Sequence, residues 1–233
     1  MHAYVWFAGG ESRTIEFLNK CSYTVWPATQ PNSQKPQLST TGFELKTNER
    51  RQVDAPFQWG GRMWARTGCS QQAGGFRCET ADCGSGAVEC NGNGGQTPAT
   101  LAEFTLDGDG GRDFYDTSLV DGFNIPLGIT PQGGTGDKCT VTDCPADVNA
   151  DCPSDLVVTA ADGKRIGCKS ACVQFGKPEY CCTPPFDNAD ACKPSRYSMF
   201  FKNKCPRAYS YAFDDLKSTF VCTGGNYLIT FCP

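Results

Sequence analysis

Apolar and polar residues alternate along several short stretches of this chain. Within residues 13–29, the apolar side chains of Ile15 and Phe17, and later of Tyr23 and Val25, recur at every second position. The same pattern recurs in three further segments, residues 39–56, 61–69 and 226–233. A period of two residues is typical of a strand that buries one face, so these segments predict short β-strands.

A fifth segment, residues 99–106, places a carboxylate within this pattern. Its two alternating sets are Leu101, Glu103 and Thr105, and Ala102, Phe104 and Leu106. Because successive side chains of a strand point to opposite faces, Glu103 is expected to point away from the face that Phe104 buries.

Two segments break the strand pattern. Residues 67–97 are rich in glycine and cysteine with almost no apolar run, and residues 146–205 combine helical fragments with closely spaced cysteines. The sequence therefore predicts a mainly β protein with two excursions from an antiparallel β-sandwich. We expect the sandwich core at residues 13–66, 98–145 and 206–233, a small disulfide-rich loop lobe at 67–97, and a disulfide-rich lobe with short helices at 146–205. Residues 1–12 are interpreted as a processed end or a remnant of an expression vector.

Cysteine dominates the composition. The chain of 233 residues has sixteen cysteines, no C-x-x-C spacing and a single histidine, His2. Zinc ligation therefore has little support, and eight disulfides formed in an oxidising compartment are expected. This predicts a secreted, extracellular or cell-wall protein.

Charge and hydropathy exclude several partners. The net charge is −4, and no stretch approaches the roughly 18 apolar residues that span a bilayer. We expect no nucleic-acid partner and no membrane span. Because His2 stands alone near the N-terminus and every cysteine can be paired, nucleophilic mechanisms based on histidine or a thiol are disfavoured. Any catalysis is expected to depend on carboxylates, without a cofactor or metal.

Carboxylates are concentrated between residues 103 and 123. Asp107, Asp109 and Asp113 surround glycines, which predicts a hairpin turn with solvated acids. Counted from Asp107, Arg112 and Ser118 occupy the sixth and twelfth positions, where a calcium-binding EF-hand loop requires Gly and Glu. The spacing therefore does not support a calcium site.

Seven sequence motifs together resemble the thaumatin-like (pathogenesis-related) proteins, and the similarity extends from about residue 13 to the C-terminus. The motifs are "TVWPA", "WARTGC", "ATLAEFTL", "DFYDTSLVDGFNIPL", "EYCC", "MFFKNKCPRAYSYAFDD" and "NYLITFCP". The resemblance implies a secreted antiparallel β-sandwich with a lobe of loops and short helices and a second small disulfide-rich lobe.

The resemblance also implies a disulfide pairing, which the sequence alone does not determine. The implied pairs are Cys21–Cys232, Cys69–Cys78, Cys83–Cys90, Cys139–Cys222, Cys144–Cys205, Cys152–Cys168, Cys172–Cys181 and Cys182–Cys192.

Many members of this family carry one Arg, one Glu and three Asp along a cleft between the sandwich and the lobe. Matched motif by motif, these positions are Arg62, Glu103, Asp116, Asp121 and Asp215. Sweet-tasting members lack parts of this set. The resemblance therefore implies a protein that binds and hydrolyses the β-1,3-glucan of fungal cell walls.

Glycosidic hydrolysis needs one protonated and one ionised carboxyl group. We assign Glu103 as the acid, Asp121 as the nucleophile or base, and Asp116 as the alternative to Asp121. Arg62 is expected to keep one aspartate ionised, and Asp215 to act from the far wall of the cleft. Alternatively, Asp116 and Asp121 only cap turns or bridge strands.

Four aromatic residues near these acids are candidate platforms for sugar rings: Phe114, Tyr115, Phe123 and Tyr209. The alternative for each of them is packing in a hydrophobic core.

The function expected from these residues is that of a monomeric, weak endo-β-1,3-glucanase with an antifungal or wall-remodelling role. The alternatives are a non-catalytic glucan-binding or membrane-perturbing antifungal protein and an inhibitor of a foreign hydrolase. Two departures from plant members favour a fungal or other non-plant origin. They are the long Cys152–Cys168 and Cys182–Cys192 loops and Arg207 in place of a common Asp.

Overall fold

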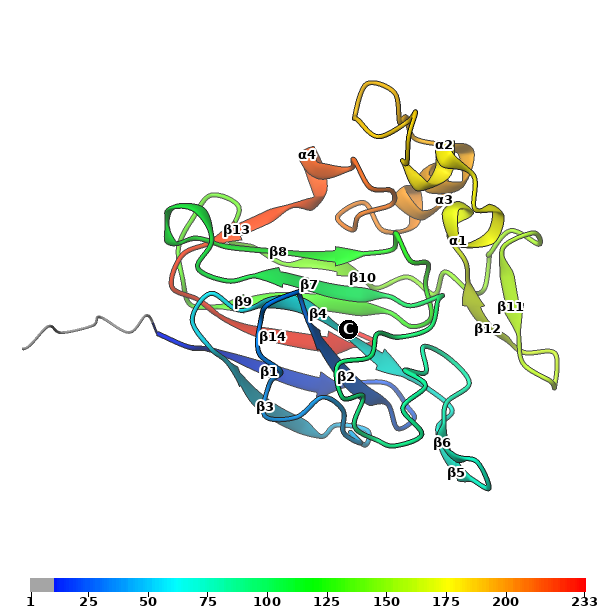
Figure 1. Cartoon of the computed structure of the whole chain (residues 1–233), viewed down its shortest axis with the longest axis horizontal. Helices are drawn as coiled ribbons and strands as arrows, with labels where there is room; N and C mark the ends of the chain where they lie inside the picture. The colour runs from blue at the N-terminus through cyan, green and yellow to red at the C-terminus, as the bar shows by residue number, and fades with distance from the viewer. Residues whose placement is uncertain (1–10) are drawn as a thin grey trace, which may run out of the picture.

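Two five-stranded sheets dominate the computed structural model, which describes residues 11–233 (Figure 1). The first sheet has the strand order β10 (Thr142–Cys144), β9 (Leu127–Gln132), β14 (Asn226–Phe231), β1 (Arg13–Asn19) and β3 (Arg50–Ala55). The second has the order β13 (Phe220–Cys222), β8 (Asp113–Ser118), β7 (Leu101–Thr105), β4 (Gly60–Arg66) and β2 (Trp26–Pro31). All pairings in these sheets are antiparallel except that of β1 with β14, which is parallel. The prediction of a mainly β, antiparallel fold is confirmed.

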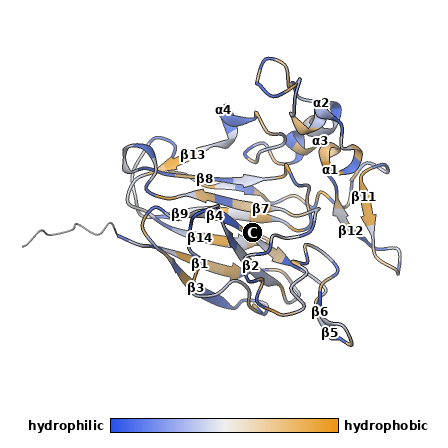
Figure 2. Cartoon of the chain, viewed as in Figure 1, coloured by the Kyte–Doolittle hydropathy of each residue, from blue (hydrophilic) through white to orange (hydrophobic). Residues whose placement is uncertain are grey.

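The main hydrophobic core contains residues from both sheets. Ile15 and Phe17 of β1 meet Met63 of β4, Phe104 of β7 and Tyr227 of β14 in one buried cluster. Figure 2 shows hydrophobic and hydrophilic residues mixed along these strands, as expected where only one face is buried. The alternation has a direct consequence for the second sheet, because the residues between the buried ones point to its outer face.

Smaller elements form the two excursions. Hairpin β5 (Ser70–Gln72) and β6 (Gly75–Arg77) belongs to the loop segment, and hairpin β11 (Val157–Thr159) and β12 (Arg165–Cys168) to the longer one. The helices are η1 (Asp109–Gly111), α1 (Ala171–Phe175), α2 (Pro178–Cys181), α3 (Arg196–Lys204) and α4 (Asp215–Ser218).

Local sequence explains where the helices of the longer excursion begin and end. Ser170 caps α1 with its hydroxyl, and Gly176 ends that helix in the left-handed region at φ 63°. Ser195 and Ser198 form a reciprocal capping box at the start of α3. Short helices at this position are therefore as predicted.

Two further clusters of buried residues accompany the excursions. One contains Leu119, Phe123, Leu156 and Phe201, and the other is centred on Trp64 of β4. The division of the chain into a sandwich and two lobes stays a prediction, and these separate clusters support it.

All sixteen cysteines form disulfides, and the family-implied pairing is confirmed for every pair. The bonds are Cys21–Cys232, Cys69–Cys78, Cys83–Cys90, Cys139–Cys222, Cys144–Cys205, Cys152–Cys168, Cys172–Cys181 and Cys182–Cys192. Cys21–Cys232 ties the chain close to both of its ends. In the loop-entropy model, a disulfide that closes such a long loop contributes more to folding stability than one that closes a short loop.

The predicted turn of solvated acids at residues 107–113 is wrong for two of its three members. Asp107 and Asp113 are buried, and both accept hydrogen bonds from Arg13, at 2.5 and 2.9 Å. Tyr227 also donates to Asp113, at 2.8 Å. Only Asp109 is solvated. A buried carboxylate needs a partner, and here the partner comes from β1, about a hundred positions away in the sequence.

Some expectations concern the N-terminus and the membrane. Residues 1–10, which include His2 and most of the interpreted 1–12 extension, lie outside the described residues. Within residues 11–233, no helix has the length and apolar character that crossing a membrane requires. The same part of the chain contains no group of three or more His, Cys, Asp or Glu arranged to hold a metal ion.

Candidate functional site: an acidic cleft on the second sheet

Three charged residues form a row across the second sheet. Arg62 of β4 is the direct cross-strand partner of Glu103 of β7, and Glu103 is the direct partner of Asp116 of β8. Their neighbours Met63, Phe104 and Tyr115 lie in the core, so the row points to the opposite, outer face. The register of the sheet thus explains why Glu103 points away from the face of Phe104, as predicted.

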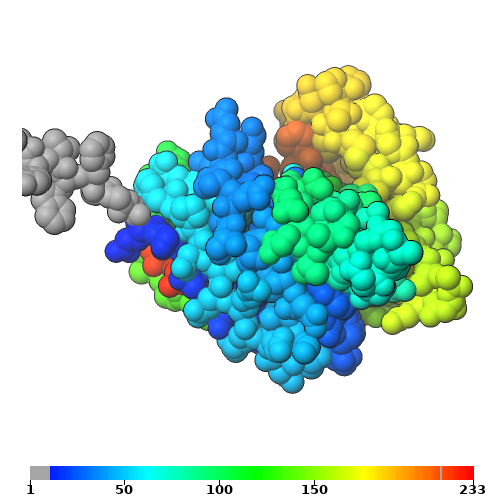
Figure 3. Space-filling model, turned by 60° about the horizontal axis from the view of Figure 1, so that its bottom comes forward, coloured from blue at the N-terminus to red at the C-terminus, as the bar shows by residue number. Residues whose placement is uncertain are grey.

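The outer face of these strands forms the floor of an open cavity of about 300 Å³. Its lining residues are Arg62, Leu101, Glu103, Asp116, Ser118, Val120, Asp121, Tyr209 and Ala212. Figure 3 shows the molecule hollowed between its blue and green parts and its yellow-to-orange part. We call this cavity the acidic cleft.

Asp121 enters the cleft from the turn that follows β8. Its Oδ2 lies 3.6 Å from Nη1 of Arg62, and both side chains are partly exposed. Gly122 fixes the turn, because its φ is 93° and a Cβ there would lie 2.6 Å from the carbonyl oxygen of Cys168. Arg62 thus adjoins two carboxyl groups: Asp121 is its ion-pair partner, and Glu103 is its neighbour in the sheet.

Burial raises the pKa of Glu103. The positive charge of Arg62 opposes this rise, the negative charge of Asp121 adds to it, and a hydrogen bond with Ser118 opposes it. The net direction is upward, so Glu103 keeps its proton to a higher pH than an exposed glutamate.

The pKa of Asp116 is raised well above its ordinary value, first by burial and then by the negative charges of Glu103 and Asp215. Oδ1 of Asp116 is buried and has no hydrogen-bond partner among the described residues. Ionisation of both carboxyl groups is unfavourable when they face each other across a strand pair, because the like charges repel. At neutral pH the Glu103–Asp116 pair therefore retains protons more readily than two separate acids.

The far wall of the cleft consists of Tyr209 and its neighbours. Tyr209 pairs with the C-terminal end of β8, because its N–H donates to the carbonyl of Thr117 at 2.8 Å and its own carbonyl accepts from the N–H of Leu119 at 2.8 Å. Its hydroxyl donates to Asp215 at 2.7 Å and is also in hydrogen-bond contact with Thr219. Burial raises the pKa of Tyr209, so it remains a neutral donor.

Lys202 of α3 anchors the segment that carries this wall. Its Nζ lies 2.7 Å from Asp214 and donates to Ala208 and Ser218, at 2.9 and 2.8 Å. Asp214 in turn accepts from the hydroxyl of Ser210 at 2.9 Å. The side chains of Tyr209 and Asp215 are therefore attached to a segment with several fixed points.

Of the four predicted aromatic platforms, the structure brings only Tyr209 to the cleft. Tyr115 is wrong as a platform, because it is buried between the sheets and its hydroxyl donates to Thr140 at 2.7 Å. Phe123 is wrong too, since it is fully buried in the cluster of the longer excursion. Phe114 does not line the cleft; its ring lies 5.4 Å from the guanidinium carbon of Arg112.

The five predicted charged residues are all at or beside the cleft. Arg62, Glu103, Asp116 and Asp121 line it, and Asp215 reaches it through its bond with Tyr209. The sequence reasoning missed four lining residues: Leu101, Ser118, Val120 and Ala212. Two of them could have been predicted from the sequence. Leu101 and Ser118 stand two positions from Glu103 and Asp116 on the same strands and therefore share their face.

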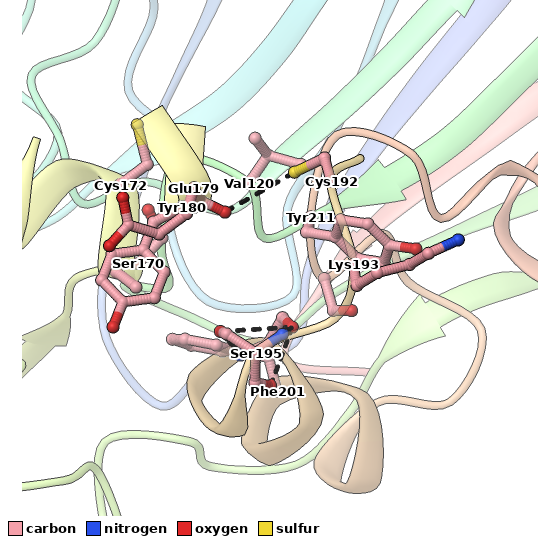
Figure 4. Close-up of a pocket in the computed structure, with 13 residues that line it drawn as sticks. Val120, Ser170, Cys172, Glu179, Tyr180, Cys192, Lys193, Ser195, Phe201 and Tyr211 are labelled. Carbon is pink, nitrogen blue, oxygen red and sulfur yellow. Dashed lines mark hydrogen bonds between the residues drawn. The ribbon is translucent and has the colours of Figure 1, made fainter. Parts of the chain in front are cut away.

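A second, much smaller cavity of about 20 Å³ lies behind Val120, between α1, α2 and the start of α3. Figure 4 shows Ser195, Tyr180, Glu179 and Lys193 around it. Its volume suits about one water molecule, so it cannot receive a sugar.

The fold and the cleft define a disulfide-rich β-sandwich protein with an acidic cleft, and the comparisons identify its family. The family model described as "Thaumatin family" matches residues 19–233. The chain therefore belongs to the thaumatin family.

Two curated plant relatives are similar along almost their whole length. A Prunus avium protein named glucan endo-1,3-beta-glucosidase is 59% identical over 229 residues, which cover 97% of this chain and 93% of the relative. Thaumatin-like protein 1 of Prunus persica is 59% identical over 233 residues, covering 99% of this chain and 94% of the relative. The expectation of a non-plant origin, based on loop length and Arg207, finds no support in these relatives.

Among solved structures, a laminaripentaose-producing β-1,3-glucanase in complex with laminaritetraose superposes with a TM-score of 0.61. The match covers 95% of this chain and 99% of that chain at 10% identity, so it shows a shared fold alone.

Proposed function

We propose that the protein binds and hydrolyses the β-1,3-glucan of fungal cell walls as a weak endo-β-1,3-glucanase, with an antifungal or wall-remodelling role. The observation that carries the proposal is the placement of two unlike carboxyl groups in one open cleft. Glu103 is largely buried and has a raised pKa, whereas Asp121 is partly exposed and paired with Arg62. The name of the Prunus avium relative supports the same activity.

Glu103 acts as the general acid. Its raised pKa keeps it protonated, so it can donate to the oxygen of the leaving sugar. Asp121 is the nucleophile or base, because it lines the open cleft, is partly exposed and lies 3.6 Å from Arg62, where its carboxylate can face the developing positive charge at the anomeric carbon.

Asp116 is the alternative to Asp121, and its burial makes it the weaker candidate for an ionised role. In this account Asp116 keeps a proton close to Glu103. Tyr209 lines the far wall, where Asp215 orients its hydroxyl. The aromatic platform for the sugar is thus reduced to Tyr209.

The setting of this activity is extracellular. Eight disulfides form and persist in oxidising compartments, which supports secretion to the cell wall or the medium. The polysaccharide is the proposed partner of a monomeric protein.

The test is hydrolysis of linear β-1,3-glucan by the purified protein, with linear β-1,4-glucan as the control polymer. We expect reducing ends to accumulate from the β-1,3-linked polymer and oligosaccharides to appear as products. Binding without any release of reducing ends would refute the hydrolase and leave a non-catalytic glucan-binding protein.

A further inference from the structure

A second groove lies away from the acidic cleft, between the base of hairpin β5–β6 and the turn end of hairpin β11–β12. Two adjoining cavities of about 390 and 530 Å³ form it, and they share the lining residues Tyr23, Asn124, Asn149, Lys164 and Arg165. The groove and the acidic cleft have no lining residue in common. In Figure 1 both hairpins, β5–β6 and β11–β12, stand at the same end of the molecule.

Two aromatic side chains give the groove an apolar surface. Tyr23 is 44% exposed, and its hydroxyl contacts only the sulfur of Cys232, at 3.9 Å, among the described residues. Trp26 is half-buried, and its ring lies 6.2 Å from that of Phe76 in an edge arrangement, which fixes its orientation. Burial and then the charge of Asp147 raise the pKa of Tyr23, so the phenol stays a neutral donor.

The charges around the groove are balanced. Lys164 and Arg165 stand on one wall, and Glu79 and Asp147 line the other parts. Within residues 11–233, none of these four side chains takes part in an ion pair. Such a rim favours neither an anion nor a cation, but it offers donors and acceptors to a neutral ligand with many hydroxyl groups.

Asn149 adds an unused acceptor to the wall of the groove. Its Nδ2 donates to the carbonyl of Asn124 at 3.0 Å, while its Oδ1 is withdrawn from solvent and has no partner among the described residues. A buried acceptor without a donor costs free energy, and a hydroxyl group of a ligand bound in the groove can serve as that donor.

We propose that this groove binds a segment of neutral β-glucan, with Tyr23 stacking on a sugar ring and Lys164, Arg165 and Asn149 bonding its hydroxyls. The proposal rests on the proposed function, because it names a second binding site for the same polymer. A protein that holds an insoluble chain in this groove raises the local concentration of glucan near the acidic cleft.

The chain offers a matched pair of variants for the test. Tyr23→Ala removes an exposed aromatic from the groove, whereas Phe57→Ala removes an equally exposed one, at 46%, that lines neither cavity. Depletion of each protein from solution by insoluble linear β-1,3-glucan measures binding. We expect binding by Tyr23→Ala to fall about three- to tenfold and binding by Phe57→Ala to match the wild type. Lys164→Gln is expected to weaken binding in the same direction.

Hydrolysis of short soluble β-1,3-oligosaccharides is measured on the same proteins, because it depends on the cleft alone. We expect unchanged turnover in Tyr23→Ala. Equal depletion of Tyr23→Ala, Phe57→Ala and wild type would overturn the groove proposal while leaving the hydrolase intact. Binding that depends on Tyr23 in a protein that hydrolyses nothing would support the groove and refute the proposed function.

Discussion

Glu103 and Asp116 face each other directly across the antiparallel strands β7 and β8. Residues in this relationship have Cβ atoms about 4.5–5.5 Å apart, and like charges there are destabilising. Arg62 stands on the other side of Glu103, so the cation of the row is next to Glu103 and one strand away from Asp116. This order explains why Asp116 has the more strongly raised pKa of the two.

Asp116→Asn is expected to stabilise the protein at neutral pH by about 0.2–1 kcal/mol, because it removes one of two opposed carboxyl groups. A raised pKa means that the folded state binds protons more tightly than the unfolded state. The cost of the pair is therefore absent below the ordinary pKa values of 3.8 and 4.5 and grows as the pH rises through the raised ones.

Urea unfolding at several pH values measures this effect. We expect the wild type to lose stability relative to Asp116→Asn between acidic and neutral pH and the two to converge at low pH. An Asp116→Asn variant that is less stable than the wild type at neutral pH would contradict this prediction, because it would show that the ionised carboxylate of Asp116 stabilises the fold.

Arg62→Gln is expected to shift the alkaline limb of the activity profile to higher pH. Arg62 lowers the pKa of Glu103, so its removal raises that pKa and keeps the acid protonated over a wider range. Activity as a function of pH measures the shift, and total activity is expected to fall because Asp121 loses its partner. An alkaline limb that moves to lower pH would contradict the assignment of Glu103 as the acid.

Asp113→Asn is expected to destabilise the fold by about 3–5 kcal/mol, because it leaves the buried guanidinium of Arg13 without one of its two carboxylates. Asp109→Asn is the matched control in the same segment, since its carboxylate is exposed. Thermal unfolding of the two variants gives the comparison, and equal melting temperatures would refute the structural role of Asp113.

The alternation at residues 99–106 was sufficient to predict the direction of Glu103, because the period of a strand fixes the face of each residue. Strand β9 was not predicted from its pattern, since Gly128 and Pro131 interrupt the apolar positions and tertiary pairing with β14 and β10 decides the outcome. The disulfide pairing followed from family resemblance and not from spacing.

Burial by distant segments could not be predicted from the sequence. Tyr115, Phe123 and Tyr209 are all aromatic residues within the motifs that carry the charged residues, yet only Tyr209 lines the cleft. The other two are buried in hydrophobic clusters that include residues from distant parts of the chain. Asp107 and Asp113 show the same limit. Their glycine-rich surroundings predicted a solvated turn, but both carboxylates are buried because they pair with Arg13 of β1. Local patterns determine the face of a strand, and long-range contacts determine what covers it.

The central claim is that Glu103 donates the proton in glucan hydrolysis, and Glu103→Gln tests it most directly, because an amide of the same shape cannot donate as an acid. Glu44→Gln, an exposed position of the sandwich, is the matched control. Release of reducing ends from linear β-1,3-glucan is measured for both variants and the wild type, together with binding to the insoluble polymer. We predict that Glu103→Gln binds the polymer but loses hydrolysis, while Glu44→Gln retains both. Wild-type hydrolysis by Glu103→Gln would contradict the account.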